Sequence, residues 1–153
     1  MFFYVVPKKT VTTYKENPET KEVEQVNVEM PQQPLNLMYF TRSSDIYQLC
    51  MQEFNPVSFD NGYTEVSYSD INRLIKRYDE DTLTPAKNRL KDYEDMLKLN
   101  YNDDLVQEML ELKEYIRDCE AVNDRLHSIS QIVFDICENY TDFESKILIN
   151  YDY

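Results

Sequence analysis

The apolar residues in the last third of the chain recur at alternating steps of four and three, the repeat of one long amphipathic helix. At Cys119 two steps of three follow one another, and this irregularity, a stammer, divides the repeat into two runs. A stammer either overwinds a continuous helix over about 103–139 or breaks it near Asn123 and Asp124, and both alternatives stand. The two runs are Leu105, Met109, Leu112, Ile116 and Cys119, then Val122, Leu126, Ile129, Val133, Ile136 and Tyr140.

A second helix is expected over residues 84–99. Thr84 followed by Pro85 is a typical helix start, because a proline in the first turn needs no amide hydrogen-bond partner. Only residues 100–102 separate this helix from the long one, and so short a connection requires antiparallel packing. The sequence therefore predicts a long helical hairpin. Its first helix carries the apolar stripe Ala86, Leu90, Tyr93 and Leu97.

Two shorter helices are expected before this hairpin. Ser43 or Ser44 can cap the first, which should end before Pro56 because a residue that precedes proline disfavours helical geometry. Residues 55–67 hold the only glycine and should form a loop, with or without a short extended piece.

The second short helix has apolar residues at helical spacing from Ile71 onward, and Ser69 is expected to cap it. The acidic residues 79–81 follow it and precede the start signal at Thr84. We therefore expect them in a solvated loop between two helices.

The first 41 residues have the features of β structure. Residues 2–6, FFYVV, are apolar throughout, as in a strand covered on both faces, while 10–15 and 22–30 flank the turn-rich ENPET as in a hairpin. Residues 35–40 are expected to form a further strand. The branched, apolar segment 146–151 predicts a last strand that pairs beside the N-terminal one.

The apolar residues in the second strand of that hairpin change from an odd-numbered position to even-numbered positions, which lie on opposite faces of a regular strand. Val23 has an odd number, whereas Val26, Val28 and Met30 have even numbers, so the four cannot share one face of a regular strand. An extra residue between them would restore a common face, which predicts a β-bulge near residues 24–25.

These patterns predict a single α+β domain over residues 1–153. An antiparallel sheet of the N-terminal strands and the C-terminal strand is accompanied by the long antiparallel helical hairpin. Residues 1–41 are expected to be mainly β, and residues 43–99 are expected to be helical with the loop at 55–67. Residues 103–139 are expected to form the long helix, and residues 146–151 are expected to form the last strand.

The scarcity of glycine and histidine excludes most enzyme chemistry. A phosphate-cradling loop or a strained serine turn needs several glycines, and this chain has Gly62 alone. Asp124 and His127, in the stretch DRLH, have the helical spacing of one metal-ligand pair, but a two-metal bundle needs a second such motif. His127 is the only histidine, so we interpret it as a surface or boundary residue. The sequence predicts a non-enzymatic protein without catalytic residues, metal or cofactor.

The three cysteines, Cys50, Cys119 and Cys137, are far apart and odd in number, which favours a reducing, intracellular location such as the cytoplasm and buried thiols. The N-terminal apolar run is too short for a secretion signal. No stretch approaches the ~18 apolar residues of a membrane span.

The net charge of −13 is concentrated near the C-terminus. Residues 1–41 contribute −1, residues 42–100 contribute −3 and residues 101–153 contribute −9. Such a surface repels nucleic acid and anionic lipid and attracts basic proteins. We expect a basic partner, in particular one that binds nucleic acid, with no direct binding of nucleic acid or membrane. The alternative is that the acidity only maintains solubility.

A stripe of acidic residues and one tyrosine on the long helix is the candidate partner-binding surface. Tyrosine is abundant, 13 in 153 residues, and provides a large contact area at low entropic cost. An ordinary solvated helix face would look similar. Residues 103–124 carry a net charge of −6, about threefold too dilute to imitate duplex DNA without a neighbouring acidic element. The candidate residues are Asp104, Glu108, Glu111, Tyr115 and Asp118 on the long helix, Asp92 and Asp95 on its antiparallel neighbour, and Tyr101 between them.

A small, acidic, glycine-poor and tyrosine-rich α+β protein resembles, in general style, the inhibitors that viruses direct against nucleic-acid-binding defence enzymes. This resemblance implies a protein that blocks a basic partner. The alternative function is a structural component, such as a virion protein, that assembles through helix–helix association. Polar Asn123 and Ser130 in the apolar stripe support that alternative, because buried polar residues can fix the register of a homo-oligomer.

Overall fold

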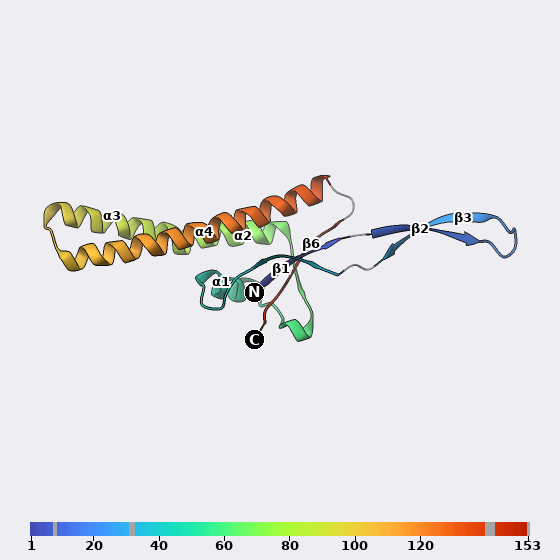
Figure 1. Cartoon of the computed structure of the whole chain (residues 1–153), viewed down its shortest axis with the longest axis horizontal. Coiled ribbons are helices and arrows are strands. Elements are labelled where there is room, and N and C mark those ends of the chain that lie inside the picture. Colours follow the sequence, from blue (N-terminus) through green and yellow to red (C-terminus); the bar gives the residue numbers. More distant parts are fainter. Residues whose placement is uncertain (8, 31–32, 140–142, 153) are drawn as a thin grey trace.

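The strands from the two ends of the chain pair with each other at the centre of an antiparallel sheet (Figure 1). The computed structural model describes residues 1–7, 9–30, 33–139 and 143–152. Strand β1 (Phe2–Pro7) lies between β4 (Leu35–Tyr39) and β6 (Phe143–Asn150), and β5 (Thr64–Val66) flanks β6. The predicted pairing of the first and last strands is confirmed. The last strand begins at residue 143 rather than 146.

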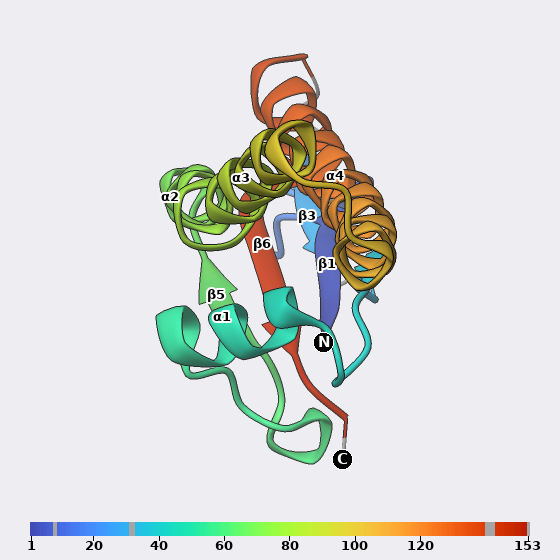
Figure 2. The ribbon, with the colours of Figure 1, turned by 90° about the vertical axis from the view of Figure 1, so that its left-hand side faces the viewer.

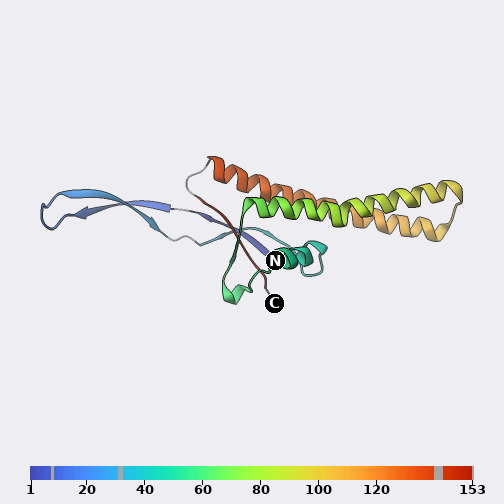
Figure 3. The ribbon, with the colours of Figure 1, turned by 180° about the vertical axis from the view of Figure 1, so that it is seen from behind.

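The predicted hairpin of β2 (Lys9–Glu16) and β3 (Val23–Met30) forms a separate two-stranded sheet. It extends far from the helices as an arm, which Figures 1 and 3 show from opposite sides. Its turn contains Lys21 at a positive φ of 57° and closes with the Lys21 amide donating to the Asn17 carbonyl at 2.8 Å.

The predicted β-bulge near residues 24–25 is wrong. The register between β2 and β3 is regular, with Glu16 opposite Val23 and Lys15 opposite Glu24. Val23 is 63% exposed and Tyr14 74% exposed. Because the arm has no core beneath it in this part, nothing requires all the valines to share one face.

Helix α1 (Asp45–Phe54) begins and ends where the sequence predicts. Ser44 is the residue that caps it, with its hydroxyl accepting from the Tyr47 amide at 3.4 Å. Asn55 ends it in left-handed geometry at φ 42°, directly before Pro56. The Asn55 amide donates to the Met51 carbonyl at 3.1 Å, which satisfies one of the last carbonyl groups of the helix.

Helix α2 (Tyr68–Tyr78) is capped by Ser67, so the expectation of Ser69 is wrong. Ser67 and Asp70 form a reciprocal capping box: the Asp70 amide donates to the Ser67 hydroxyl at 3.1 Å, and the Ser67 amide donates to the Asp70 carboxylate at 2.8 Å. Donation by the Ser67 amide and hydroxyl lowers the pKa of Asp70 below its ordinary value. Ser69 has no acid three residues ahead of it that could complete such a box.

The expected loop at residues 79–81 is also wrong, because a single π-helical turn, η2 (Asp79–Leu83), joins α2 to α3 (Thr84–Leu99). The Thr84 amide donates to the Asp79 carbonyl five residues earlier, and Pro85 has no amide hydrogen to continue an α-helical ladder. Leu83 is buried and anchors the turn to the core, while the acidic side chains 79–81 remain exposed.

Helix α4 (Asp103–Asn139) is one continuous helix of 37 residues, which decides between the two alternatives for the stammer. It packs antiparallel to α3, as predicted, and Figure 2 shows this pair beside α2 above the strands. Leu126 and Ile129, just beyond the stammer, are fully buried. Ser130 donates to the Asn72 side-chain carbonyl at 2.8 Å and so links α4 to α2.

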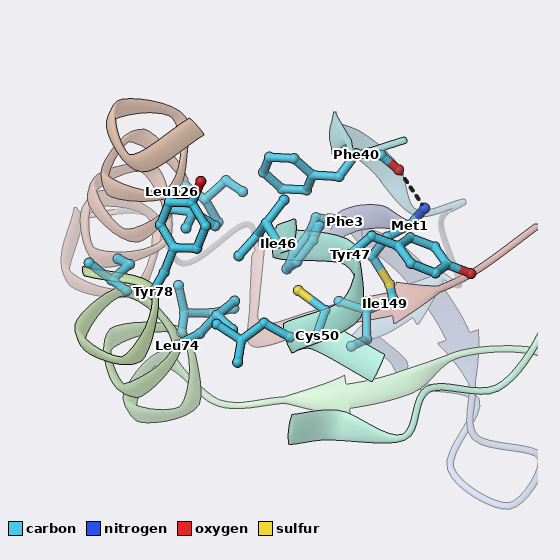
Figure 4. Packing of buried hydrophobic residues seen from close by; sticks show 14 of the residues in the cluster. Met1, Phe3, Phe40, Ile46, Tyr47, Cys50, Leu74, Tyr78, Leu126 and Ile149 are labelled. Atoms are coloured by element: carbon cyan, nitrogen blue, oxygen red, sulfur yellow. Dashed lines mark hydrogen bonds between the residues drawn. The ribbon is translucent and has the colours of Figure 1, made fainter. Parts of the chain in front are cut away.

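The core forms where the inner face of the sheet meets α1, α2 and α4 (Figure 4). The ammonium group of Met1 donates to the buried Phe40 carbonyl at 2.9 Å. This bond fixes the start of β1 beside the end of β4. The residues that Figure 4 labels around it include Phe3 and Ile149 of the sheet, Ile46 and Cys50 of α1, Leu74 and Tyr78 of α2, and Leu126 of α4.

The capping box predicts that Ser67 and Ser69 differ in how much each contributes to stability. Ser67→Ala removes the cap of α2 and should lower the free energy of unfolding by about 1 kcal/mol. Ser69→Ala, the matched control, should change it by less than about 0.5 kcal/mol, as usual for an exposed site. Urea denaturation of both variants measures the difference. Equal effects would contradict the assignment of the cap.

Candidate functional site

A surface cavity of about 870 Å³ opens between α1, η2, α3 and α4, and we call it the acidic groove. The helical hairpin with the adjoining π-helical turn forms one wall, and α1 forms the other. Its position follows from the packing of α4 against α2 and α3, which brings distant parts of the sequence together. Its lining residues are Asp45, Gln48, Asp81, Thr82, Pro85, Ala86, Arg89, Tyr93, Glu108, Glu111, Leu112 and Tyr115.

Carboxylates dominate the groove, with four acids and the single cation Arg89 among its lining residues. Arg89 donates to the Tyr93 hydroxyl at 3.1 Å, and its guanidinium lies 5.5 Å from the centre of that ring. Within the described part of the chain, no ion pair joins Arg89 to a carboxylate of the groove. The lining therefore has a net charge of −3.

The four carboxylates differ in their partners. Asp81 pairs with Arg77 at 3.3 Å, and Glu111 accepts from the Gln107 side-chain amide at 3.1 Å. Glu108 has no ion-pair or hydrogen-bond partner among the described residues. Glu108 and Glu111 therefore present negative charge that the chain itself does not neutralise with a cation.

Tyr115 connects the two walls of the groove. Its hydroxyl donates to the Asp45 carboxylate at 2.5 Å and so links α4 to the start of α1. Burial, the hydrogen bond to Asp45 and the neighbouring Cys119 thiol raise the pKa of Tyr115. Burial and the same thiol raise the pKa of Tyr78.

Two of the three cysteines are buried, in agreement with the predicted core thiols. Cys119 is buried next to Tyr78 and Tyr115, and Cys50 lies in the core, where burial raises its pKa to about 12. A thiol with a raised pKa is a poor nucleophile at neutral pH. The side chain of Cys137 lies outside the described residues.

The acidic groove contains three of the eight candidate partner-binding residues, Glu108, Glu111 and Tyr115. The other five lie outside it and are exposed. Asp95 pairs with Lys98 at 3.1 Å. The remaining four are Asp118 on α4, Asp104 near the hairpin tip, Tyr101 in the tip loop at 72% exposure, and Asp92 on α3.

The neighbouring acids on α3 and α4 do not form a continuous row of negative charge. Glu94 of α3 pairs with Lys113 of α4 at 3.7 Å, and Glu120 of α4 pairs with Lys87 of α3 at 2.7 Å. These cross-helix pairs neutralise charge between the helices, so the acidity of the surface is concentrated in separate patches, of which the groove is one.

Sequence reasoning missed Asp45, Asp81, Arg89 and Tyr93 as lining residues. The sequence predicts Asp81 in a loop and Tyr93 only in the apolar stripe. The one available signal is the predicted antiparallel packing of 84–99 on the long helix, which brings Tyr93 opposite the first third of that helix.

Asp124 and His127 are both exposed on α4. No group of three or more histidine, cysteine or acidic side chains that could hold a metal ion occurs in the described part of the chain. None of the described helices is both long enough and apolar enough to cross a membrane.

Comparison with protein-family models, with curated proteins and with solved structures found no match.

The hydrogen bond between Tyr115 and Asp45 leads to a pH-dependent prediction. Tyr115→Phe should lower the free energy of unfolding by about 1 kcal/mol at neutral pH, the value of a typical hydrogen bond. Because the pKa of Tyr115 is raised in the folded state, this stabilisation is complete below the ordinary tyrosine pKa of about 10 and is lost as the pH rises towards the raised pKa.

The difference in the free energy of unfolding between the parent protein and Tyr115→Phe should therefore become smaller above pH ~10. Denaturation curves at several pH values measure it. Tyr101→Phe, at an exposed position, is the control and should change the stability by less than about 0.5 kcal/mol at neutral pH. A difference that widens at high pH would refute the assigned role of Tyr115.

Proposed function

We propose that the protein is a non-enzymatic inhibitor that binds a basic, nucleic-acid-handling protein through the acidic groove and the adjoining face of α4. The observation that carries this proposal is the presence in one groove of Glu108 and Glu111, neither of which has a cation partner in the described chain. A partner that binds nucleic acid exposes a basic surface for phosphate groups. Occupying that surface with carboxylates blocks the nucleic acid.

Electrostatic steering supports this mode of action. The whole chain carries −13, so a basic protein is attracted from a distance before any contact forms. The groove then gives the encounter a defined geometry, since α4 and α1 fix its carboxylates on rigid helices. The acids on α3 contribute less to the attraction of a basic partner, because lysines partly neutralise them.

Charge reversal in the groove tests the proposal. Glu108→Lys/Glu111→Lys should abolish capture of basic proteins from a nucleic-acid-binding protein fraction. Glu19→Lys/Glu22→Lys, in the turn of the arm, makes the same change in net charge and should retain capture. For a captured protein, association should slow at least about tenfold between low and high salt, and duplex DNA should compete for it. The proposal would be refuted if both charge-reversal variants lost capture of basic proteins equally, or if binding of a captured protein did not depend on salt.

The arm favours a second candidate function, an assembly component. The polar residues of the apolar stripe support this function less than the sequence suggests, because Ser130 donates to Asn72 of the same chain. Leu126 and Ile129 of the stripe are also buried within the chain itself. The arm gives the stronger support for an assembly function. An isolated two-stranded hairpin is marginally stable in water, and docking on another subunit would stabilise the hairpin.

Sedimentation separates the two candidate functions. An assembly component should form a stoichiometric homo-oligomer that persists in high salt, and Tyr14→Lys/Val23→Lys should dissociate it, because both residues are exposed on the arm. Tyr101→Lys, at another exposed aromatic position, is the control and should leave the oligomer intact. A monomer at all concentrations would refute the assembly function and leave the inhibitor proposal in place.

A further inference from the structure

We infer that the acidic groove accepts an arginine side chain of the partner and prefers it to lysine. This inference rests on the proposed function and specifies the chemistry of its contact. It joins three features of the groove: a pair of carboxylates on one helix, aromatic rings in the wall, and a guanidinium that the chain itself places against one of those rings.

The carboxylate pair supplies two neighbouring acceptors for a forked ligand. Glu108 and Glu111 are three residues apart on α4, so they are neighbours on the surface of that helix. Asp45 lies across the groove on α1, where the Tyr115 hydroxyl holds it. A guanidinium has five donors in a plane and can bond two carboxylates at once, whereas an ammonium group acts as a point charge.

The aromatic wall already holds a guanidinium. Arg89 lies over the ring of Tyr93, with 5.5 Å between the guanidinium carbon and the ring centre, and donates to its hydroxyl at 3.1 Å. A cation–π contact of this kind is more often made by arginine than by lysine. Arg89 has no carboxylate partner among the described residues, so its position beside Tyr93 does not depend on an ion pair.

The remaining lining suits the rest of an arginine side chain. Leu112, half-buried in the hairpin wall, supplies apolar surface against which the aliphatic stem can lie while the charged end reaches the carboxylates. The cavity, at about 870 Å³, has room for the stem and the flanking peptide backbone.

Arg89 opposes the ligand, because it is the one positive charge in the lining. Removing that charge changes the net charge of the lining from −3 to −4 and should tighten the binding of a cation. Lys91 lies on the same helix, is exposed and does not line the groove. Arg89→Gln and Lys91→Gln therefore form a matched pair that separates local charge from overall charge.

The experiment uses two capped peptides of equal length and charge, one of alternating glycine and arginine and one of alternating glycine and lysine. Calorimetry with the full chain at about 0.15 M ionic strength should give an affinity roughly fivefold to tenfold higher for the arginine peptide. Glu108→Gln/Glu111→Gln should remove the preference, and Glu19→Gln/Glu22→Gln should retain it. Arg89→Gln should strengthen binding of the arginine peptide, whereas Lys91→Gln should not.

The outcomes separate this inference from the proposed function. Equal affinities for the two peptides, or a preference that survives Glu108→Gln/Glu111→Gln, would overturn the inference even if the chain still captures basic proteins through salt-dependent contacts. Failure of the chain to capture any basic protein would overturn the proposed function. An arginine preference that depends on Glu108 and Glu111 would support the inference whichever partner is found.

Discussion

Burial of one continuous apolar stripe along α4 is the interaction on which the rest of the structure depends. Leu126 and Ile129 of this stripe are fully buried, and each such side chain stabilises the fold by about 1.5–3 kcal/mol. The same stripe fixes the rotation of α4 against α2 and α3. That rotation turns Glu108, Glu111 and Tyr115 towards α1, so the groove is a consequence of how the core is packed.

The periodic elements could be predicted from the sequence, because a repeat that extends over many residues outweighs local ambiguity. The long helix and its antiparallel neighbour belong to this class, whereas the pairing of the terminal strands could be predicted from two short apolar runs. The errors fell where a single contact decides the structure. Asp70 selects Ser67 over Ser69 as the cap, buried Leu83 keeps the chain helical through the acidic turn, and the absence of a core beneath Val23 removes the need for a bulge.

The candidate site was predictable only along one helix. Spacing placed Glu108, Glu111 and Tyr115 on a common face, but Asp45 and Arg89 join them through tertiary packing, which no local pattern encodes. The partners of the acids were equally hidden from the sequence. Lys113 neutralises Glu94 because α3 and α4 are in a particular axial register, and a different register would have left a different set of carboxylates unpaired.

The arm of β2 and β3 makes its regular contacts almost wholly within itself, strand against strand in one unbroken register. Its opening and closing are therefore largely uncoupled from the unfolding of the core. Substitutions in its exposed turn change a free energy that is local to the arm, and they leave the packing around α4 unaffected. A change of sequence in this exposed turn can accordingly alter what the arm contacts, while the helical body keeps its shape.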